Sequence, residues 1–207
     1  KLISELNMPV GILNANLGGT SILTWLSRET IENDSALLAD CVNNNVYIPL
    51  ESWNESAVNF GLYMTSNYNK IISPLKNFRL SGMIWYQGES DISWQYGRYP
   101  SAFNALQKSY TELFGYKNGL LPVVFTQLAS YSYGNISLLP SMNAEFLEIQ
   151  QQQPESRALT SIYDVPLDYT IDVHAIHPLR KQEVGEKMAH AASGLVYGLN
   201  SSYTAAG

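Results

Sequence analysis

Side chains that could do chemistry gather at residues 80–91 (LSGMIWYQGESD), where an apolar stretch ends abruptly. Residues 83–86 form a short apolar run, which predicts a buried strand. Gln87, Glu89, Ser90 and Asp91 follow at once, and Gly88 among them allows a sharp turn or a close approach to a ligand. Ligands of open α/β sheets bind beyond the carboxyl ends of the strands. This run therefore predicts a substrate-facing loop, and an ordinary polar loop after a strand is the alternative.

Two further polar segments follow expected strands, namely Gly18-Gly19-Thr20 and residues 174–178 (HAIHP). In a parallel sheet all three segments would share one edge, with the backbone donors, the side-chain donor and the base that an acyl-transfer site needs. The amide of Gln87 can stabilise an oxyanion, and the imidazole of His177 can take a proton near neutral pH. Alternatively, the glycines serve only a tight turn and His177 only begins a helix. A metal site at His174 and His177 is disfavoured, because no third ligand has suitable spacing.

Short apolar runs alternate with amphipathic stretches along the chain, and hairpin signals are few. This order indicates an α/β fold, a three-layer α/β/α sandwich with a mainly parallel sheet covered on both faces. We expect one catalytic domain over residues 1–198, with 199–207 as a tail or the start of a connection. The expected strands are 10–13, 80–86, 121–128 and 158–165, and the expected helices are 1–6, 35–42, 55–76, 98–114, 143–153 and 178–198.

Composition excludes several classes of function. The 207 residues carry a net charge of −6 without an acidic or basic block, so no Lys/Arg stripe exists for nucleic acid. Cys41 is the single cysteine, which excludes an intrachain disulfide and a cysteine-rich metal site. No apolar run reaches membrane-spanning length. Residues 1–6 resemble the last turns of a helix already under way, so Lys1 is not expected to be a natural start.

Several runs taken together resemble the sialate O-acetylesterase group of SGNH-type carbohydrate esterases, over about residues 7–197. The resemblance implies a flavodoxin-like α/β/α fold and a serine esterase that removes O-acetyl groups from sugars, with no metal and no organic cofactor. The runs are Pro9-Val10-Gly11-Ile12, Gly18-Gly19-Thr20 with Trp25, Trp85-Tyr86-Gln87-Gly88-Glu89-Ser90, and Ile176-His177-Pro178 with Lys181-Gln182-Glu183-Val184-Gly185.

The same resemblance implies roles for individual residues. It assigns Gly19 or Gly18, with Gln87, to the oxyanion hole and His177 to the catalytic base. Glu89 is a candidate for substrate binding, although a buried, hydrogen-bonded scaffold for its loop is the alternative. Trp94 is a second candidate, in an aromatic cluster with Tyr96 and Tyr99 that could either stack on a sugar ring or pack in the core.

Two departures from the family pattern concern the nucleophile and the acid. The family's nucleophilic Ser lies in a Gly-Gln-Ser-Asn motif upstream of the Gly-Gly block, and residues 1–207 contain no such motif. The chain therefore looks like a fragment, and we expect a second polypeptide that carries the nucleophile strand. Related enzymes often have Asp three residues before the histidine, where this chain has His174. Asp172 is the nearest upstream carboxylate, and a backbone carbonyl holding the imidazole of His177 is equally plausible.

The predicted function is hydrolysis of O-acetyl esters on sugars through an acetyl-serine intermediate, with sialic acid as the first choice of sugar. The alternatives are an acetylxylan esterase and a catalytically inactive carbohydrate-binding domain that retains the fold. The expected partner is an O-acetylated sugar or glycan, with no nucleic acid and no membrane. The resemblance alone implies a secreted or periplasmic location, or a lysosomal one in a eukaryote.

Overall fold

The computed structural model describes residues 1–52, 63–92, 98–168, 170 and 176–199. Trp94, Asp172 and His174 lie outside these residues. The chain divides into two compact units. The first comprises Lys1–Leu13, Ser81–Tyr86 and Leu121–Gly207, and the second comprises Asn14–Leu80 and Gln87–Leu120.

A parallel sheet forms the centre of the first unit. Its strands are β1 (Met83–Trp85), β2 (Val123–Thr126) and β3 (Arg157–Thr160), in the order β1-β2-β3. Ile84 pairs with Val124, and Val124 pairs with Ala158. Every residue of β2 and β3 is buried, as expected of parallel strands covered on both faces.

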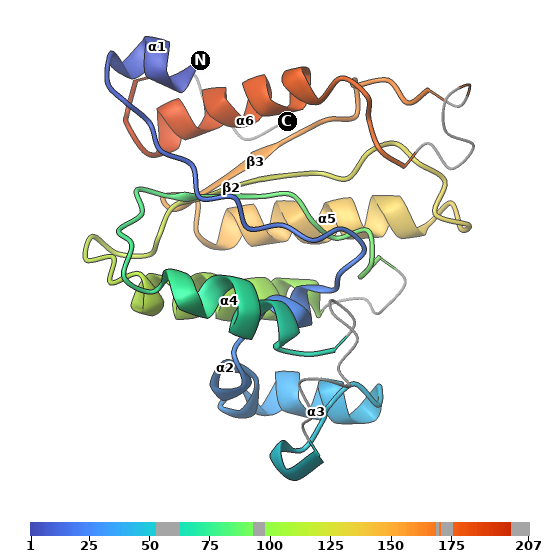
Figure 1. The fold of residues 1–207 in the computed structure, drawn as a ribbon. Helices are drawn as coiled ribbons and strands as arrows, with labels where there is room; N and C mark the ends of the chain where they lie inside the picture. Colours follow the sequence, from blue (N-terminus) through green and yellow to red (C-terminus); the bar gives the residue numbers. More distant parts are fainter. Residues whose placement is uncertain (53–62, 93–97, 169, 171–175, 200–207) are drawn as a thin grey trace. The chain divides into compact units, whose positions relative to one another are not determined.

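Helices cover the two faces of this sheet, α6 (Lys181–Leu195) on one and α5 (Leu138–Gln152) on the other (Figure 1). Side chains of a strand alternate between faces. Val124 accordingly joins the buried cluster of α6, which includes Val184 and Met188. The neighbouring Phe125 packs edge-on against Phe146 of α5, with ring centroids 6.0 Å apart. The predicted parallel α/β arrangement is confirmed.

The second unit is helical in its described parts. Its helices are η1 (Ile22–Trp25), α2 (Arg28–Glu32), α3 (Ser35–Asn43), η2 (Leu50–Ser52), η3 (Tyr68–Ile72), η4 (Ser73–Leu75) and α4 (Tyr99–Leu113). One apolar face of α4 is buried, with Phe103, Leu106 and Tyr110 each at most 2% exposed. The hydroxyl of Tyr110 donates to the carbonyl of Trp25 at 2.9 Å, which ties α4 to η1.

Several predicted boundaries were wrong. Residues 10–13 form no strand, and Ile12 is 86% exposed. The described end of the expected helix 55–76 is a π-helical turn followed by the 3-10 turn η4. Helix α5 begins at Leu138 rather than residue 143, and α6 begins at Lys181 rather than Pro178. The helix predicted for residues 1–6 is α1 (Leu2–Leu6), which packs against α6.

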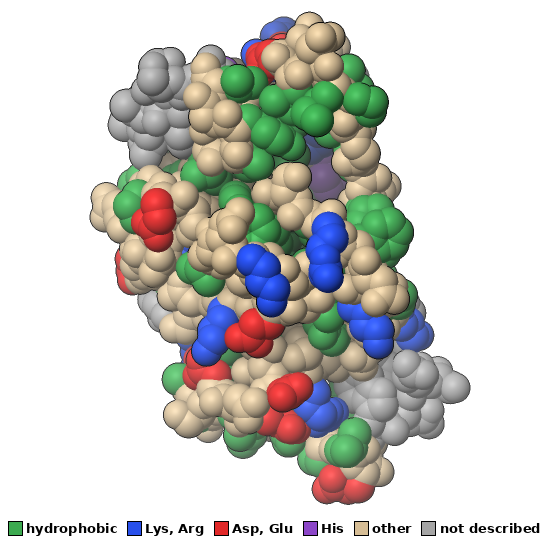
Figure 2. All heavy atoms as spheres, turned by 90° about the vertical axis from the view of Figure 1, so that its left-hand side faces the viewer, with side chains coloured by type: hydrophobic (Ala, Val, Ile, Leu, Met, Phe, Trp, Pro, Cys, Tyr) green, Lys and Arg blue, Asp and Glu red, His purple; other side chains and the backbone are tan. Residues whose placement is uncertain are grey.

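The surface carries charges of both signs. On the face that Figure 2 shows, Lys and Arg side chains are interspersed with Asp and Glu. Ion pairs in the first unit include Lys187 with Asp164, with an Nζ–Oδ2 distance of 2.8 Å. No helix within the described residues has the length and apolar character needed to cross a bilayer.

The thiol of Cys41 is fully buried on α3, and we predict that it is unreactive in the native protein. Burial, and then the nearby charge of Asp40, raise its pKa from 9.0 to about 11, with Arg98 opposing them. A thiol reagent at pH 8 should label native protein about 100-fold more slowly than urea-unfolded protein, because only the thiolate reacts.

The same shift makes stability depend on pH. The folded state holds the thiol proton more tightly than the unfolded state, so this contribution is complete below pH 9 and is lost as the pH rises towards 11. The Cys41→Ala variant should lack that loss when urea unfolding is compared between pH 8 and pH 10. Equal labelling rates in native and unfolded protein would contradict the prediction that the native thiol of Cys41 is unreactive.

Candidate active site

The Gly18-Gly19-Thr20 turn belongs to the second unit and precedes η1. Gly19 has φ +72°, a left-handed conformation that suits glycine, and the space around both glycines is open. The hydroxyl of Thr20 donates to the carbonyl of Leu17 and accepts from Nε1 of Trp25, both at 2.9 Å. Glycine therefore forms the exposed part of this turn, while the residue that follows is anchored in the core.

Ser21 caps η1. Its side-chain oxygen accepts from the backbone N–H of Leu23 at 3.3 Å. The same hydroxyl donates to Oδ1 of Asp91 at 2.6 Å, across 70 positions of sequence. Ser21 thus serves the local helix and a distant loop together, which favours a structural role over that of a nucleophile.

The side-chain amide of Gln87 has all its principal hydrogen-bonding positions occupied. Nε2 donates to the carbonyl of Thr20 at 2.9 Å and to Oδ2 of Asp91 at 2.6 Å. Oε1 accepts from the hydroxyl of Tyr99 at 2.8 Å. The amide therefore has one orientation, and two of the predicted site segments, the Gly18-Gly19-Thr20 turn and Gln87, are hydrogen-bonded to each other.

Asp91 is the buried charge at the centre of this arrangement. Besides Ser21 and Gln87, the backbone N–H of Ile22 donates to its Oδ2 at 2.8 Å. The residue is 8% exposed. Burial raises the pKa of Asp91, while the hydrogen bonds from Ser21, Gln87 and Ile22 oppose that rise. A carboxyl group so far from water depends on those donors.

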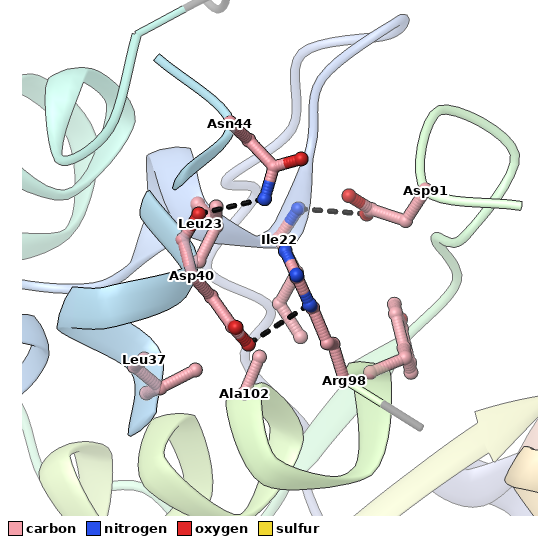
Figure 3. Close-up of a pocket in the computed structure, with 9 residues that line it drawn as sticks. Ile22, Leu23, Leu37, Asp40, Asn44, Asp91, Arg98 and Ala102 are labelled. Atoms are coloured by element: carbon pink, nitrogen blue, oxygen red, sulfur yellow. Dashed lines mark hydrogen bonds and ion pairs between the residues drawn. The ribbon is translucent and has the colours of Figure 1, made fainter. Parts of the chain in front are cut away.

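A small pocket lies beside this network in the second unit, with a volume of about 40 Å³ (Figure 3). Figure 3 shows Asp91 directed at the backbone nitrogen of Ile22. Nε of Arg98 lies 3.0 Å from Oδ2 of Asp40, and the amide of Asn44 donates to the Asp40 carbonyl at 2.6 Å. These contacts join the second unit's segments that line the pocket.

His177 lies in the first unit and is exposed, whereas Pro178 after it is buried. Because α6 begins at Lys181, with Arg180 as its N-cap residue, Pro178 does not occupy the first helical position as predicted. Glu89 is half-buried. The described residues bring together no group of three or more His, Cys, Asp or Glu side chains suited to a metal ion.

Sequence reasoning missed the roles of Asp91 and Tyr99. The sequence does not by itself assign a role to Asp91, although its Gln-x-x-x-Asp spacing from Gln87 is a local signal of the contact between them. Tyr99 is 4% exposed, so it belongs to the core rather than to a sugar-stacking surface. No local pattern indicates that its hydroxyl meets Gln87.

The parallel sheet between helices places the chain among α/β proteins. Within that class, the chain belongs to the carbohydrate esterase family of sialic acid-specific acetylesterases, whose model matches residues 1–193. A solved carbohydrate acetylesterase from Xanthomonas citri has a similar fold, with a TM-score of 0.68 and 26% identity over 95% of this chain and 39% of that one. The expected family and its α/β fold are confirmed.

Two curated relatives are sialate O-acetylesterases from mammals. The mouse protein is 24% identical over 223 residues, which cover 95% of this chain and 41% of the mouse protein. The human protein is 27% identical over 208 residues, covering 95% of this chain and 38% of the human protein. The chain therefore spans about two-fifths of the length of these relatives.

We predict that Gln87→Glu destabilises the second unit strongly. A carboxylate oxygen would replace Nε2, so the hydrogen bonds that Nε2 donates to Thr20 and Asp91 would be lost. That oxygen would also lie about 2.6 Å from the carboxylate of Asp91. The expected loss in the free energy of unfolding is about 2–3 kcal/mol, measured by urea denaturation. Because repulsion raises the pKa of both acids, the loss should grow from pH 5 to pH 8.

Gln182→Glu is the matched control. The amide of Gln182 also donates to a carboxylate, that of Glu186 at 2.8 Å, but both are exposed. Solvent screens such a pair, so the expected loss is under about 1 kcal/mol. Equal losses in the two variants would show that the buried network contributes nothing special.

Proposed function

We propose that the intact protein removes O-acetyl groups from sugars, with O-acetylated sialic acid as the preferred substrate. The observation that carries this proposal is the hydrogen bond between Gln87 and Thr20, which joins two of the family's motif segments at 2.9 Å. Family membership and the sialic acid specificity in the family's description support the choice of substrate. By the same reasoning the protein is secreted, periplasmic or lysosomal.

The proposed reaction is acyl transfer through an acetyl-enzyme. A serine hydroxyl from outside residues 1–207 attacks the ester carbonyl carbon, and His177 takes the hydroxyl proton. Gln87 and the backbone of Gly18 or Gly19 stabilise the oxyanion, whose collapse expels the sugar hydroxyl with the proton from His177. Water, deprotonated by His177, then attacks the acetyl-serine and releases acetate and the free serine.

The remaining roles are assigned from residue type and position in the sequence. Asp172, or a backbone carbonyl, would orient the imidazole of His177. Glu89 and Trp94 would contact the sugar. None of these steps requires a metal or an organic cofactor.

His177→Ala in the intact protein should lower kcat for an aryl acetate by about 10³-fold or more, as for other members of catalytic triads. His190→Ala is the matched control, since His190 lies within α6 and has no proposed part in the reaction. Steady-state hydrolysis of the aryl acetate measures both. Turnover by His177→Ala near that of His190→Ala would remove His177 from the mechanism.

An intact protein that binds acetylated sugars without turnover would instead be an inactive carbohydrate-binding domain.

A second polypeptide segment that carries the nucleophile strand is part of the proposal. Strand β1 lies at the edge of the described sheet, and its central residue Ile84 is 55% exposed. In the same unit, Ile12 and Leu13 are exposed in a stretch of β-type sequence that forms no strand. Unpaired apolar edges of this kind favour pairing with a further strand.

Native mass spectrometry of active protein should therefore show residues 1–207 together with such a segment, either covalently continuous or retained after a cut. Ile84→Lys should reduce its retention in a nicked sample, because a charge would enter the strand interface. Ile136→Lys is the matched control, since Ile136 is 91% exposed and belongs to no strand. An active monomer of residues 1–207 alone, or a homodimer paired through β1, would contradict this part of the proposal.

A further inference from the structure

The two N–H groups of the Gln87 side chain have unequal partners. One donates to a buried carboxylate, Oδ2 of Asp91, at 2.6 Å, and the other to a neutral carbonyl, that of Thr20, at 2.9 Å. Hydrogen bonds to charged groups are shorter and roughly twice as strong as neutral ones. A developing oxyanion could therefore take the N–H now bonded to Thr20 while the bond to Asp91 stays intact.

The oxygen of the Gln87 amide is held by a side chain of α4. Tyr99, buried in the first turn of α4, donates its hydroxyl to Oε1 of Gln87 at 2.8 Å. A flip of the amide would bring the oxygen of Gln87 against the carboxyl oxygen of Asp91, which is unfavourable. Asp91 therefore selects one amide orientation, and Tyr99, whose hydroxyl also lies 3.2 Å from the Gln87 carbonyl oxygen, supports that orientation through its bond to Oε1.

Asp91 also holds the residues that follow the Gly18-Gly19-Thr20 turn. Its two oxygens accept from the hydroxyl of Ser21 at 2.6 Å and the backbone N–H of Ile22 at 2.8 Å. Ser21 directly follows the Gly18-Gly19-Thr20 turn. One buried carboxyl group therefore connects that turn to Gln87.

We infer that Asp91 is a positioning residue that acts through Gln87, holding one amide N–H so that the other is presented at the Gly18-Gly19-Thr20 turn, while Tyr99 holds the amide oxygen. This inference rests on the proposed esterase function. Asp91 itself does not touch the reacting atoms. The inferred effect of Asp91 is on how well Gln87 stabilises the transition state.

The kinetic test uses Asp91→Asn and Tyr99→Phe in the intact protein, with an aryl acetate as substrate. Asp91→Asn should lower kcat by about 10²-fold and Tyr99→Phe by about tenfold, each with KM changed less than about twofold, because misplacing a transition-state donor affects chemistry more than binding. Tyr110→Phe is the matched control. It removes another buried hydroxyl of α4, one that donates to Trp25, and should leave kcat unchanged.

The same substitutions in a Gln87→Ala background separate positioning from general damage to the fold. If Asp91 and Tyr99 act through Gln87, each should change kcat less than about twofold once Gln87 is gone. Effects that multiply fully in that background would overturn the inference, as would a folded Asp91→Asn protein with parental kcat. If Asp91→Asn does not fold, the comparison of Tyr99→Phe with Tyr110→Phe decides.

A spectroscopic readout keeps the inference separate from the proposed function. The side-chain amide protons of Gln87, assigned by their loss in Gln87→Ala, should exchange slowly with water. Asp91→Asn and Tyr99→Phe should shift these resonances and speed their exchange, while Tyr110→Phe should not. With no turnover in the parent protein, the esterase proposal fails and this arm still tests the network. Unchanged amide resonances in both variants would overturn the network role.

Discussion

The hydrogen bond between Gln87 and Asp91 is the interaction on which the candidate site depends. Asp91 is buried, so its carboxyl group needs donors in place of water, and these come from Ser21, Ile22 and Gln87. Removing one donor would leave a buried charge partly unsatisfied, at a cost larger than a typical hydrogen bond. The turn before η1 and the loop that begins at Gln87 are consequently fixed by the same group.

Much of the fold could be predicted because its signals are local. Strand β2 is an unbroken apolar run, so its burial on both faces is visible in the sequence. The apolar face of α4 recurs at helical spacing, and its observed bounds, Tyr99–Leu113, differ from the predicted helix by one residue at each end. Parallel pairing followed from the alternation of strands and helices, since crossover connections favour it.

The errors arise where structure depends on partners distant in sequence. Residues 10–13 have β-type sequence, but a strand exists only where another strand completes its ladder, and no described residue does so for them. The start of α6 differs from the prediction because proline is favoured at the first helical position, whereas this chain turns at Leu179 and Arg180 before the helix begins. Ser21 and Asp91 meet across 70 positions, which no periodic pattern can indicate.

The site also shows why motif residues that contact substrate have to be distinguished from those that position other side chains. Glutamine after a strand suggests a donor to substrate, yet in this structure both N–H groups of Gln87 bond to protein. Any catalytic use of the side chain must exchange the bond to the Thr20 carbonyl for one to substrate. Exchanging one neutral acceptor for a more negative one is favourable, whereas giving up the carboxylate partner is not. The chemistry open to Gln87 is therefore set by Asp91, a residue whose importance comes from burial rather than from reactivity.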